Sequence, residues 1–346
     1  MPGTGPGGPG RGATFADRRA FLASGAAWPD EPPPDCTETH ASLVFLTRTR
    51  AWKLKKPVRL IHVDQRTLAS RERLCREEIR VNREMSGDVY RGLIPLVQRG
   101  DGTLALGGAG RVVDWLIETV RLPAAEMLDR RLADGPAPCA ARIEALSTAL
   151  VDFYRRQAPS PGEGETFCRR LRTDSRVAAA HLHEMAGPAG IRLPAGVADN
   201  ALPALRACRD EILERARRGV LREGHGDLRA EHVCLTEPPV LFDRLEIDHG
   251  LRLVDPFFEV NALGLECGLL GADRIRDRLL HRLAEAVPPP TRPLLSVYGI
   301  VSCLTRARFA VDHFRDDVVS EPAKYRARAV AYLGAAADLV ARAQAH

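Results

Sequence analysis

Several common sequence features are missing from this chain of 346 residues. No apolar run approaches the roughly 18 to 20 residues of a membrane span, and the Gly- and Pro-rich residues 1–12 contain no apolar stretch typical of a secretory leader. The eight cysteines form no CxxC pair, which favours buried free thiols in a reducing cytosol over a zinc site or a disulfide framework. These absences predict a cytoplasmic protein with no membrane partner.

Lysine is also scarce, because only four of the 50 Lys and Arg residues are lysines. The net charge of +5 is small for this length and is spread along the chain, so no nucleic-acid partner is expected. Three of the four lysines nevertheless stand at Lys53, Lys55 and Lys56. A lysine is a compact charge that suits phosphate, although lysines also protect edge strands.

Hydrophobic periodicity divides the chain into two parts. In residues 15–121, alternating apolar positions predict an antiparallel sheet with strands at 43–46, 51–58, 93–97, 103–106 and 111–120, and helices at 16–24 and 67–86. In residues 122–346, helical spacing predicts helices at 125–132, 140–156, 176–185, 204–218, 260–270, 274–285, 294–314 and 323–343. Residues 1–14 are expected to be a disordered tail. Strands followed by helices predict a bilobal α+β protein.

A polar loop in the second part is typical of phosphoryl-transfer chemistry. The stretch His225-Gly-Asp-Leu-Arg-Ala-Glu-His232 precedes two short apolar runs that predict a hairpin. Its spacing matches the catalytic loop of protein kinases, in which an Asp on the next strand turn binds metal. This pattern makes Asp227 the residue that receives a substrate hydroxyl, Arg229 a nearby cation and Asp243 a magnesium ligand. A solvated hairpin is the simpler alternative.

The second half of such a site lies far upstream. Period two places Lys53 and Lys55 on one face of their strand, where they are candidates for binding nucleotide phosphates. Glu78, on the following helix, is the carboxylate expected to fix one of these lysines, although it could instead pair with arginines of its own helix. The residues leave open which lysine contacts the phosphates.

These motifs together resemble the aminoglycoside phosphotransferase and choline kinase group, and most closely an uncharacterised bacterial branch within it. The likeness covers roughly residues 36–315 and rests on five motifs, namely Glu38-Thr-His-Ala-Ser42, Trp52-Lys-Leu-Lys-Lys-Pro57, Glu77-Glu-Ile-Arg-Val-Asn82, the His225–His232 loop, and Phe242-Asp-Arg-Leu-Glu246 with Asp255-Pro256. The resemblance implies a protein kinase-like fold and transfer of the γ-phosphoryl group of ATP or GTP to a hydroxyl, with Mg²⁺ or Mn²⁺. His225 and Arg229 would join Asp227 as catalytic residues.

Two departures from the family pattern stand out. His232 replaces the metal-binding Asn, and imidazole is a softer ligand than magnesium prefers. The loop before Leu43 has no glycine, so the side chains of Thr39, His40 and Ser42 would have to contact the phosphates.

These departures motivate an alternative function, a pseudokinase or nucleotide-binding regulatory module without transfer activity. A third hypothesis is a transition-metal hydrolase that uses the two histidines and two aspartates of the loop region, His225, Asp227, His232 and Asp243. For a kinase, acidic residues of the helical part are candidates for meeting a cationic acceptor, namely Glu259, Glu266 and Asp273. The sequence does not predict the acceptor itself or the oligomeric state.

Overall fold

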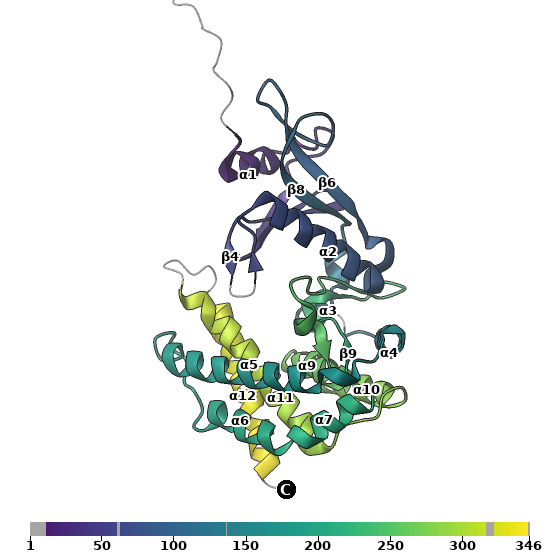
Figure 1. The fold of residues 1–346 in the computed structure, drawn as a ribbon, viewed down its shortest axis with the longest axis vertical. Helices are drawn as coiled ribbons and strands as arrows, with labels where there is room; N and C mark the ends of the chain where they lie inside the picture. The colour runs from purple at the N-terminus through teal and green to yellow at the C-terminus, as the bar shows by residue number, and fades with distance from the viewer. Residues whose placement is uncertain (1–11, 61–62, 136, 316–321, 345–346) are drawn as a thin grey trace, which may run out of the picture. The chain divides into compact units, whose positions relative to one another are not determined.

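The computed structural model describes residues 12–60, 63–135, 137–315 and 322–344. The chain divides into two compact units, Met1–Pro123 and Ala124–His346 (Figure 1). The first contains an antiparallel sheet and two helices, and the second is mostly helical, so the predicted α+β class is confirmed. Most of the predicted tail, residues 1–11, lies outside the described residues, whereas Thr14 caps the first helix.

The first unit is built on a six-stranded antiparallel sheet in the order β1-β2-β3-β8-β6-β7. Its elements are α1 (Phe15–Ala23), β1 (Asp35–Glu38), β2 (Ser42–Leu46), β3 (Arg50–Lys55), α2 (Leu68–Ser86), β6 (Tyr90–Gln98), β7 (Leu104–Leu106) and β8 (Arg111–Val120), with a small hairpin of β4 (Arg59–Leu60) and β5 (Val63–Asp64). The sequence did not predict β1. All four residues of this strand are exposed, so it has no alternation of buried and exposed positions.

Strand β3 has the two faces that its sequence predicted. Trp52 and Leu54 belong to the apolar core of the first unit, where the Trp52 and Trp28 rings lie 5.4 Å apart. Lys53 and Lys55 are on the other face, where both contact α2. The alternation of side chains along the strand therefore separates the core from the charged cluster.

A buried ionic network ties the two helices of the first unit to the sheet. Asp114 of β8 is fully buried and accepts from Arg18 of α1 at 2.5 Å and from Arg71 of α2 at 2.8 Å. Two arginines on one carboxylate satisfy its lone pairs, which is the condition for keeping such a charge in a protein interior. The network fixes α2, which carries Glu78, against the sheet.

The second unit consists of ten helices and two short strand pairs within the described residues. The helices are α3 (Leu128–Ala133), α4 (Ala140–Arg156), α5 (Gly164–Met185), α6 (Val197–Ala207), α7 (Arg209–Arg217), α8 (His249–Arg252), α9 (Pro256–Leu269), α10 (Asp273–Ala284), α11 (Arg292–Asp312) and α12 (Pro322–Gln344). β9 (Arg222–Glu223) pairs with β12 (Leu253–Val254), and β10 (Val233–Cys234) pairs with β11 (Val240–Leu241). The single helix predicted at 204–218 was wrong, because the backbone leaves helical geometry at Cys208 and separates α6 from α7.

Helix α11 is the most apolar long helix of the described chain. Together with the turn after it, 292–315, it is long and apolar enough by composition to cross a membrane, with a mean hydropathy of 1.4 in its best window. In this structure 67% of that window is buried against protein, as in the core helix of a folded domain. The sequence analysis looked for an apolar run long enough to span a membrane and did not find this segment, because Arg306 and Arg308 interrupt it.

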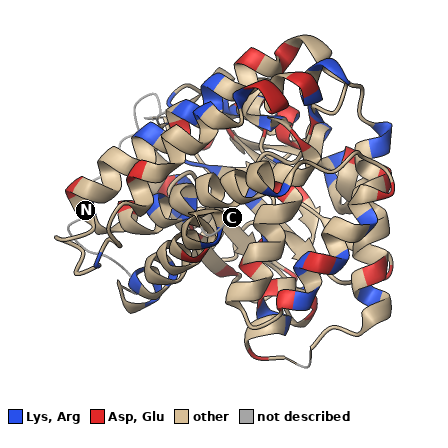
Figure 2. Ribbon diagram, turned by 90° about the horizontal axis from the view of Figure 1, so that it is seen from below, with Lys and Arg blue, Asp and Glu red and all other residues tan. Residues whose placement is uncertain are grey.

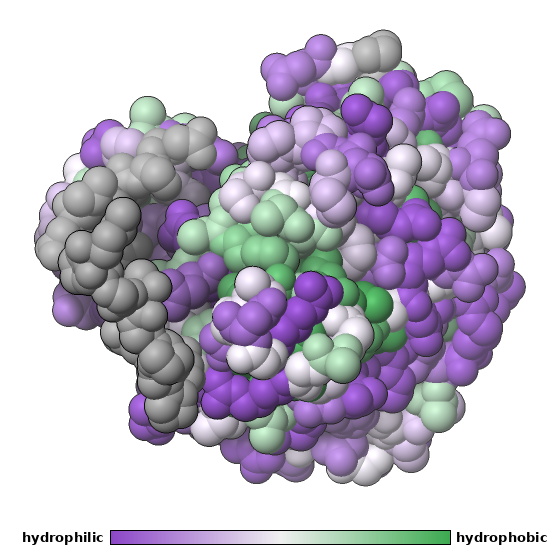
Figure 3. Space-filling model, turned by 90° about the horizontal axis from the view of Figure 1, so that it is seen from above, coloured by the Kyte–Doolittle hydropathy of each residue, from purple (hydrophilic) through white to green (hydrophobic). Residues whose placement is uncertain are grey.

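The surface carries charges of both signs. Basic and acidic residues alternate along many helices (Figure 2), and on the face seen in Figure 3 hydrophilic residues surround a limited apolar area. All eight cysteines are free thiols, as predicted. Six are buried, but Cys36 and Cys139 are exposed, so the prediction of burial was wrong for these two.

Candidate functional site

In the first unit, Glu78 lies between the two lysines of β3. Lys53 Nζ is 2.8 Å from Glu78 Oε1, and Lys55 Nζ is 2.6 Å from Glu78 Oε2. Glu78 is fully buried and the Lys55 side chain is only 2% exposed, whereas that of Lys53 is 22% exposed. The Glu78 carboxylate therefore binds one lysine through each of its oxygens.

The alternative partner for this carboxylate is excluded by the direction of the side chains on α2. Glu77, on the solvent side, makes the pair within the helix, with Arg80 Nη2 at 2.7 Å. Glu78 is one position further round and points inward to the sheet. The predicted contact between Glu78 and a strand lysine is therefore present, and it is made twice.

The turn between β1 and β2 uses its own polar groups. The Thr39 hydroxyl accepts from the Ser42 amide at 3.0 Å, and the Thr39 amide donates to the Ser42 carbonyl at 2.9 Å. Ser42 is 1% exposed, and its hydroxyl is buried. The turn therefore uses the Thr39 hydroxyl, whereas the buried Ser42 hydroxyl has no hydrogen-bond partner among the described residues. Their contact with phosphate stays a prediction. His40 remains exposed.

In the second unit, His225 braces the loop that carries Asp227. The His225 ring is fully buried, its Nε2–H donates to the Phe242 carbonyl at 2.9 Å, and its Nδ1 accepts from the Asp227 amide at 3.3 Å. Burial and the neighbouring His232 ring lower the pKa of His225 to about 3, so the imidazole is neutral. Both ring nitrogens contact the backbone of the loop region, so in this structure His225 positions the loop, and its expected catalytic role stays a prediction.

Helix α9 holds the same loop with two carboxylates. Glu259 accepts from the His225 amide at 2.8 Å and from the Gly226 amide at 3.0 Å, and Glu266, two turns later, accepts from the Ala230 amide at 2.8 Å. Asp255 caps the start of this helix and binds Arg215 at 2.6 Å, so the helix is itself fixed. The loop is thereby held at both ends.

These contacts correct the prediction that acidic residues of this part meet a cationic acceptor. Glu259 is 4% exposed and also accepts from the Tyr154 hydroxyl at 2.5 Å, so burial raises its pKa and its oxygens serve the loop. The two Glu266 oxygens are taken by the Tyr332 hydroxyl and the Ala230 amide. Asp273 lines a separate groove between α9, α10 and α12.

Asp227 projects from this braced loop. Its side chain is 33% exposed, and Arg306 Nη1 of α11 lies 2.5 Å from its Oδ1. Burial alone would raise the pKa of Asp227, but Arg306, His232 and Arg229 outweigh that effect and hold the pKa below its usual range. Asp227 is therefore an ionised carboxylate.

His232 and Asp243 form a second pair of polar groups. The His232 ring stacks on His225 with 5.7 Å between centroids, its Nδ1–H donates to the Asp227 carbonyl at 2.8 Å, and its Nε2 is 3.6 Å from Asp243 Oδ2. Asp243 is the one residue other than glycine with a positive φ, 59°, in the described chain. Arg244, fully buried, donates to the Gly224 carbonyl at 2.8 Å and so fixes the chain beside it.

These groups fit a hard divalent ion that is bound mainly through a substrate. Within the described ranges no cluster of three or more His, Cys, Asp or Glu side chains is placed to hold a metal, so the transition-metal hydrolase hypothesis lacks its ligand set. Magnesium commonly uses one or two protein carboxylates together with substrate phosphates. Asp243, with a side chain 40% exposed, can supply that carboxylate, and His232 can contribute its Nε2.

Arg229 is engaged with acidic neighbours. It forms a close ion pair with Glu231 and lies 3.6 Å from Glu266 Oε1, while Arg328 of α12 is 3.6 Å from the other side of Glu231. Burial would lower the pKa of Arg229, but these carboxylates raise it, so it stays charged. Glu231 lies between Arg229 and Arg328 and contacts both arginines.

Sequence reasoning missed the residues that α11 and α12 bring to the loop. Arg306 pairs with Asp227, and Tyr332 orients Glu266. A charged residue inside the otherwise apolar helix α11 was the only sequence signal for Arg306. Nothing local marked Tyr332, because its partner is 66 positions away.

Comparisons with known proteins place these observations in context. No family model matches the sequence. Uncharacterised proteins of Mycobacterium tuberculosis and Mycobacterium bovis are 26% identical over 282 residues, which cover 79% of this chain and 54% of theirs. The chain therefore spans about half the length of these curated relatives.

Solved structures similar to the chain are small-molecule kinases. A choline/ethanolamine kinase family protein from Mesorhizobium loti matches with a TM-score of 0.48 and 16% identity, covering 94% of each chain. Choline kinase from Streptococcus pneumoniae matches with a TM-score of 0.47 and 11% identity, covering 93% of this chain and 99% of its own. A thermostable mutant of an aminoglycoside phosphotransferase matches with a TM-score of 0.49 and 12% identity, covering 90% of this chain and 95% of its own.

Proposed function

We propose that this chain is a phosphotransferase that moves the γ-phosphoryl group of ATP or GTP to a hydroxyl group of a small molecule. The observation that carries the proposal is Asp227, an ionised and partly exposed carboxylate on a loop whose backbone is fixed by His225 and Glu259. A rigid carboxylate can accept a hydrogen bond from a hydroxyl and aim its oxygen at a phosphorus atom. Its lowered pKa makes it a weak base, so orienting the hydroxyl is its main task.

The first unit supplies the positive charge for the nucleotide phosphates in this proposal. Lys53 is the better candidate for that contact, because its side chain is 22% exposed and that of Lys55 only 2%. Lys55, buried against Glu78, would hold the carboxylate in place. This assignment chooses between the two lysines that the sequence left open.

Asp243 is the proposed protein ligand for Mg²⁺ or Mn²⁺, and His232 the neighbouring group. When bound, the ion would neutralise charge on the phosphates. The His232 ring is oriented by its hydrogen bond to the Asp227 carbonyl, and its Nε2 faces Asp243. Arg229 would add a fixed positive charge close to Asp227.

One observation favours the runner-up, a nucleotide-binding module without transfer activity. The His232 Nε2 lies 3.6 Å from the Asp243 carboxylate, where a proton on that nitrogen would form an ion pair in place of a metal contact. In that case nucleotide binding would not depend on a divalent ion. The two functions therefore differ in whether nucleotide binding requires a divalent ion, which can be measured.

The test is thermal stabilisation by ATP or GTP, each with and without magnesium or manganese. A nucleotide at 100 times its dissociation constant should stabilise the fold by about 2.7 kcal/mol. We expect metal-dependent stabilisation in the wild type and its loss in Asp243→Asn, since Asn tolerates the same positive φ without the charge.

The matched control is Asp210→Asn, whose side chain is 98% exposed on α7. Nucleotide should stabilise this variant as much as it stabilises the wild type. If nucleotide stabilises the protein equally with and without metal, and equally in Asp243→Asn, the result would support the binding module. If neither ATP nor GTP stabilises the protein, the proposal is overturned.

A further inference from the structure

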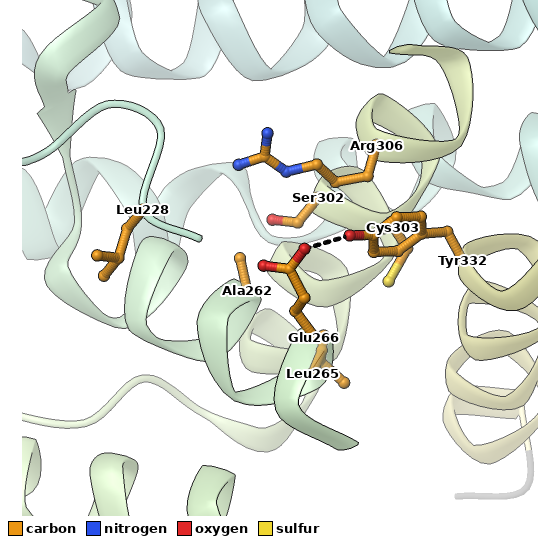
Figure 4. Close-up of a pocket in the computed structure, with 8 residues that line it drawn as sticks. All are labelled: Leu228, Ala262, Leu265, Glu266, Ser302, Cys303, Arg306 and Tyr332. Carbon is orange, nitrogen blue, oxygen red and sulfur yellow. Dashed lines mark hydrogen bonds between the residues drawn. The ribbon is translucent and has the colours of Figure 1, made fainter. Parts of the chain in front are cut away.

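A small recess lies beside Asp227, formed by the loop and by helices α9, α11 and α12. Its free volume is about 10 Å³, which is room for roughly one water-sized atom. Its lining is mostly apolar, with four polar side chains (Figure 4), and consists of Leu228, Ala262, Leu265, Glu266, Ser302, Cys303, Arg306 and Tyr332. A space of this size admits a single oxygen atom of a ligand, while the rest of the ligand stays at its open side.

Arg306 brings a positive charge to this recess. Its side chain is 17% exposed, and its Nη1 contacts the Asp227 carboxylate at 2.5 Å. A cationic acceptor that placed its hydroxyl at Asp227 would have to bring its charge close to the guanidinium. Like charges at such short range destabilise each other, so the position of Arg306 disfavours cationic acceptors.

Ser302 stands one turn before Arg306 on the same face of α11. The residue is 7% exposed, and its hydroxyl has no hydrogen-bond partner among the described residues. Figure 4 shows it between the Arg306 guanidinium and the Glu266 carboxylate. A buried hydroxyl without a partner is costly, and a ligand oxygen in the recess would satisfy it.

Glu266 does not turn the recess into a site for cations. One of its oxygens accepts from the Tyr332 hydroxyl at 2.6 Å and the other from the Ala230 amide at 2.8 Å. Arg229 lies 3.6 Å away and balances its charge. The groups left to meet a ligand are therefore donors, the Arg306 guanidinium and the Ser302 hydroxyl.

We infer that Arg306 and Ser302 bind an oxyanion of the acceptor, so that the acceptor is a small hydroxyl compound carrying a carboxylate or a phosphate. This inference rests on the proposed function. A guanidinium forms paired hydrogen bonds with such groups, and Ser302 adds a third donor. When Arg306 contacts the ligand anion, the Asp227 carboxylate becomes available to the acceptor hydroxyl.

The experiment uses the full chain saturated with magnesium and a non-hydrolysable ATP analogue. Binding of four three-carbon or two-carbon probes is measured by calorimetry, namely glycerate, glycerol 3-phosphate, glycerol and ethanolamine. We expect one or both anions to bind roughly tenfold or more tightly than neutral glycerol, as hydrogen bonds to a charged group suggest. Glycerate and glycerol 3-phosphate distinguish a carboxylate from a phosphate.

Variants then assign the effect to the recess. Arg306→Met should weaken anion binding roughly tenfold or more, and Arg306→Lys should recover part of it, because Lys keeps the charge without the planar fork. Arg308→Lys, on the same helix but paired with Asp312, is the matched control and should bind as the wild type does. The metal-dependent stabilisation by nucleotide should be unchanged in all three.

Two kinds of failure can be told apart. If nucleotide fails to stabilise the protein, the proposed function fails and this inference fails with it. If nucleotide stabilises normally but the anions bind no better than glycerol, or ethanolamine binds better, the inference about the acceptor is overturned. Unchanged anion binding in Arg306→Met has the same consequence.

Discussion

The two units hold their polar clusters by different means. In the first, Glu78 is fixed by side-chain ion pairs with Lys53 and Lys55. In the second, the loop around Asp227 is fixed mainly through its backbone, by the neutral ring of His225 and the carboxylate of Glu259. One cluster depends on charge balance in the interior, and the other depends on hydrogen-bond geometry.

This difference indicates what each cluster can do. The lysines of the first cluster act on an anion through charge, and a charge–charge attraction tolerates a change in the position of that anion. A loop held at several backbone amides keeps the Asp227 carboxylate in one position. Phosphoryl transfer to a hydroxyl requires such a fixed position. Removing a charge should therefore damage the two units in different ways.

The largest effect is expected for Asp227→Asn, which keeps the shape of the side chain and removes its charge. Phosphoryl transfer should fall by about 10²–10⁴-fold, because the acceptor hydroxyl loses its orienting carboxylate. Stabilisation by nucleotide with magnesium should remain close to that of the wild type. The measurement is the turnover of Asp227→Asn, with the exposed variant Asp210→Asn as the control. If Asp227→Asn lost nucleotide binding as much as turnover, Asp227 would not act on the acceptor hydroxyl alone.

The next effect concerns the stability of the first unit. Glu78→Gln removes the buried carboxylate charge beside the Lys55 ammonium, so the free energy of unfolding should fall by about 3–5 kcal/mol. Glu77→Gln, one residue away, breaks a more exposed pair with Arg80 and should cost about 1 kcal/mol or less. Denaturant unfolding of both variants provides the comparison. Equal destabilisation would show that burial of the Glu78 cluster contributes nothing.

The smallest effect is a pH dependence in the second unit. The pKa of His225 is about 3 in the folded protein, below an unfolded value of about 6.5, so acid protonates the unfolded chain first. The stability that neutral His225 provides is complete above pH 6.5 and is lost as the pH falls toward 3. At pH 5 the loss from this group is about 2 kcal/mol.

The measurement is the change in unfolding free energy between pH 7 and pH 5. His225→Asn should show a smaller change than the wild type, and His281→Asn, at a side chain 77% exposed, should show the same change as the wild type. Titration of the His225 ring by NMR in the wild type gives an independent reading. A ring that protonates near pH 6.5 would refute the assignment of a buried neutral imidazole.

Local patterns in the sequence predicted much of this structure. Period two along β3 separated Lys53 and Lys55 from Trp52 and Leu54, and helical spacing predicted α2 with Glu78 near the lysines. These features could be predicted because each depends on side-chain directions within one element. The exposed strand β1 and the break between α6 and α7 lacked such a pattern. The roles of the loop residues stay predictions.

The sequence by itself determined the α+β class, most of the longer elements and the motif of the loop from His225 to Asp243, because apolar periodicity and motif spacing are properties of the chain. Only the tertiary structure decided that Glu259 and Glu266 serve the loop backbone, that Ser42 is buried, and that Arg306 reaches Asp227. These contacts join residues 33 to 79 positions apart. Packing of whole helices sets such distances, and no local pattern encodes them.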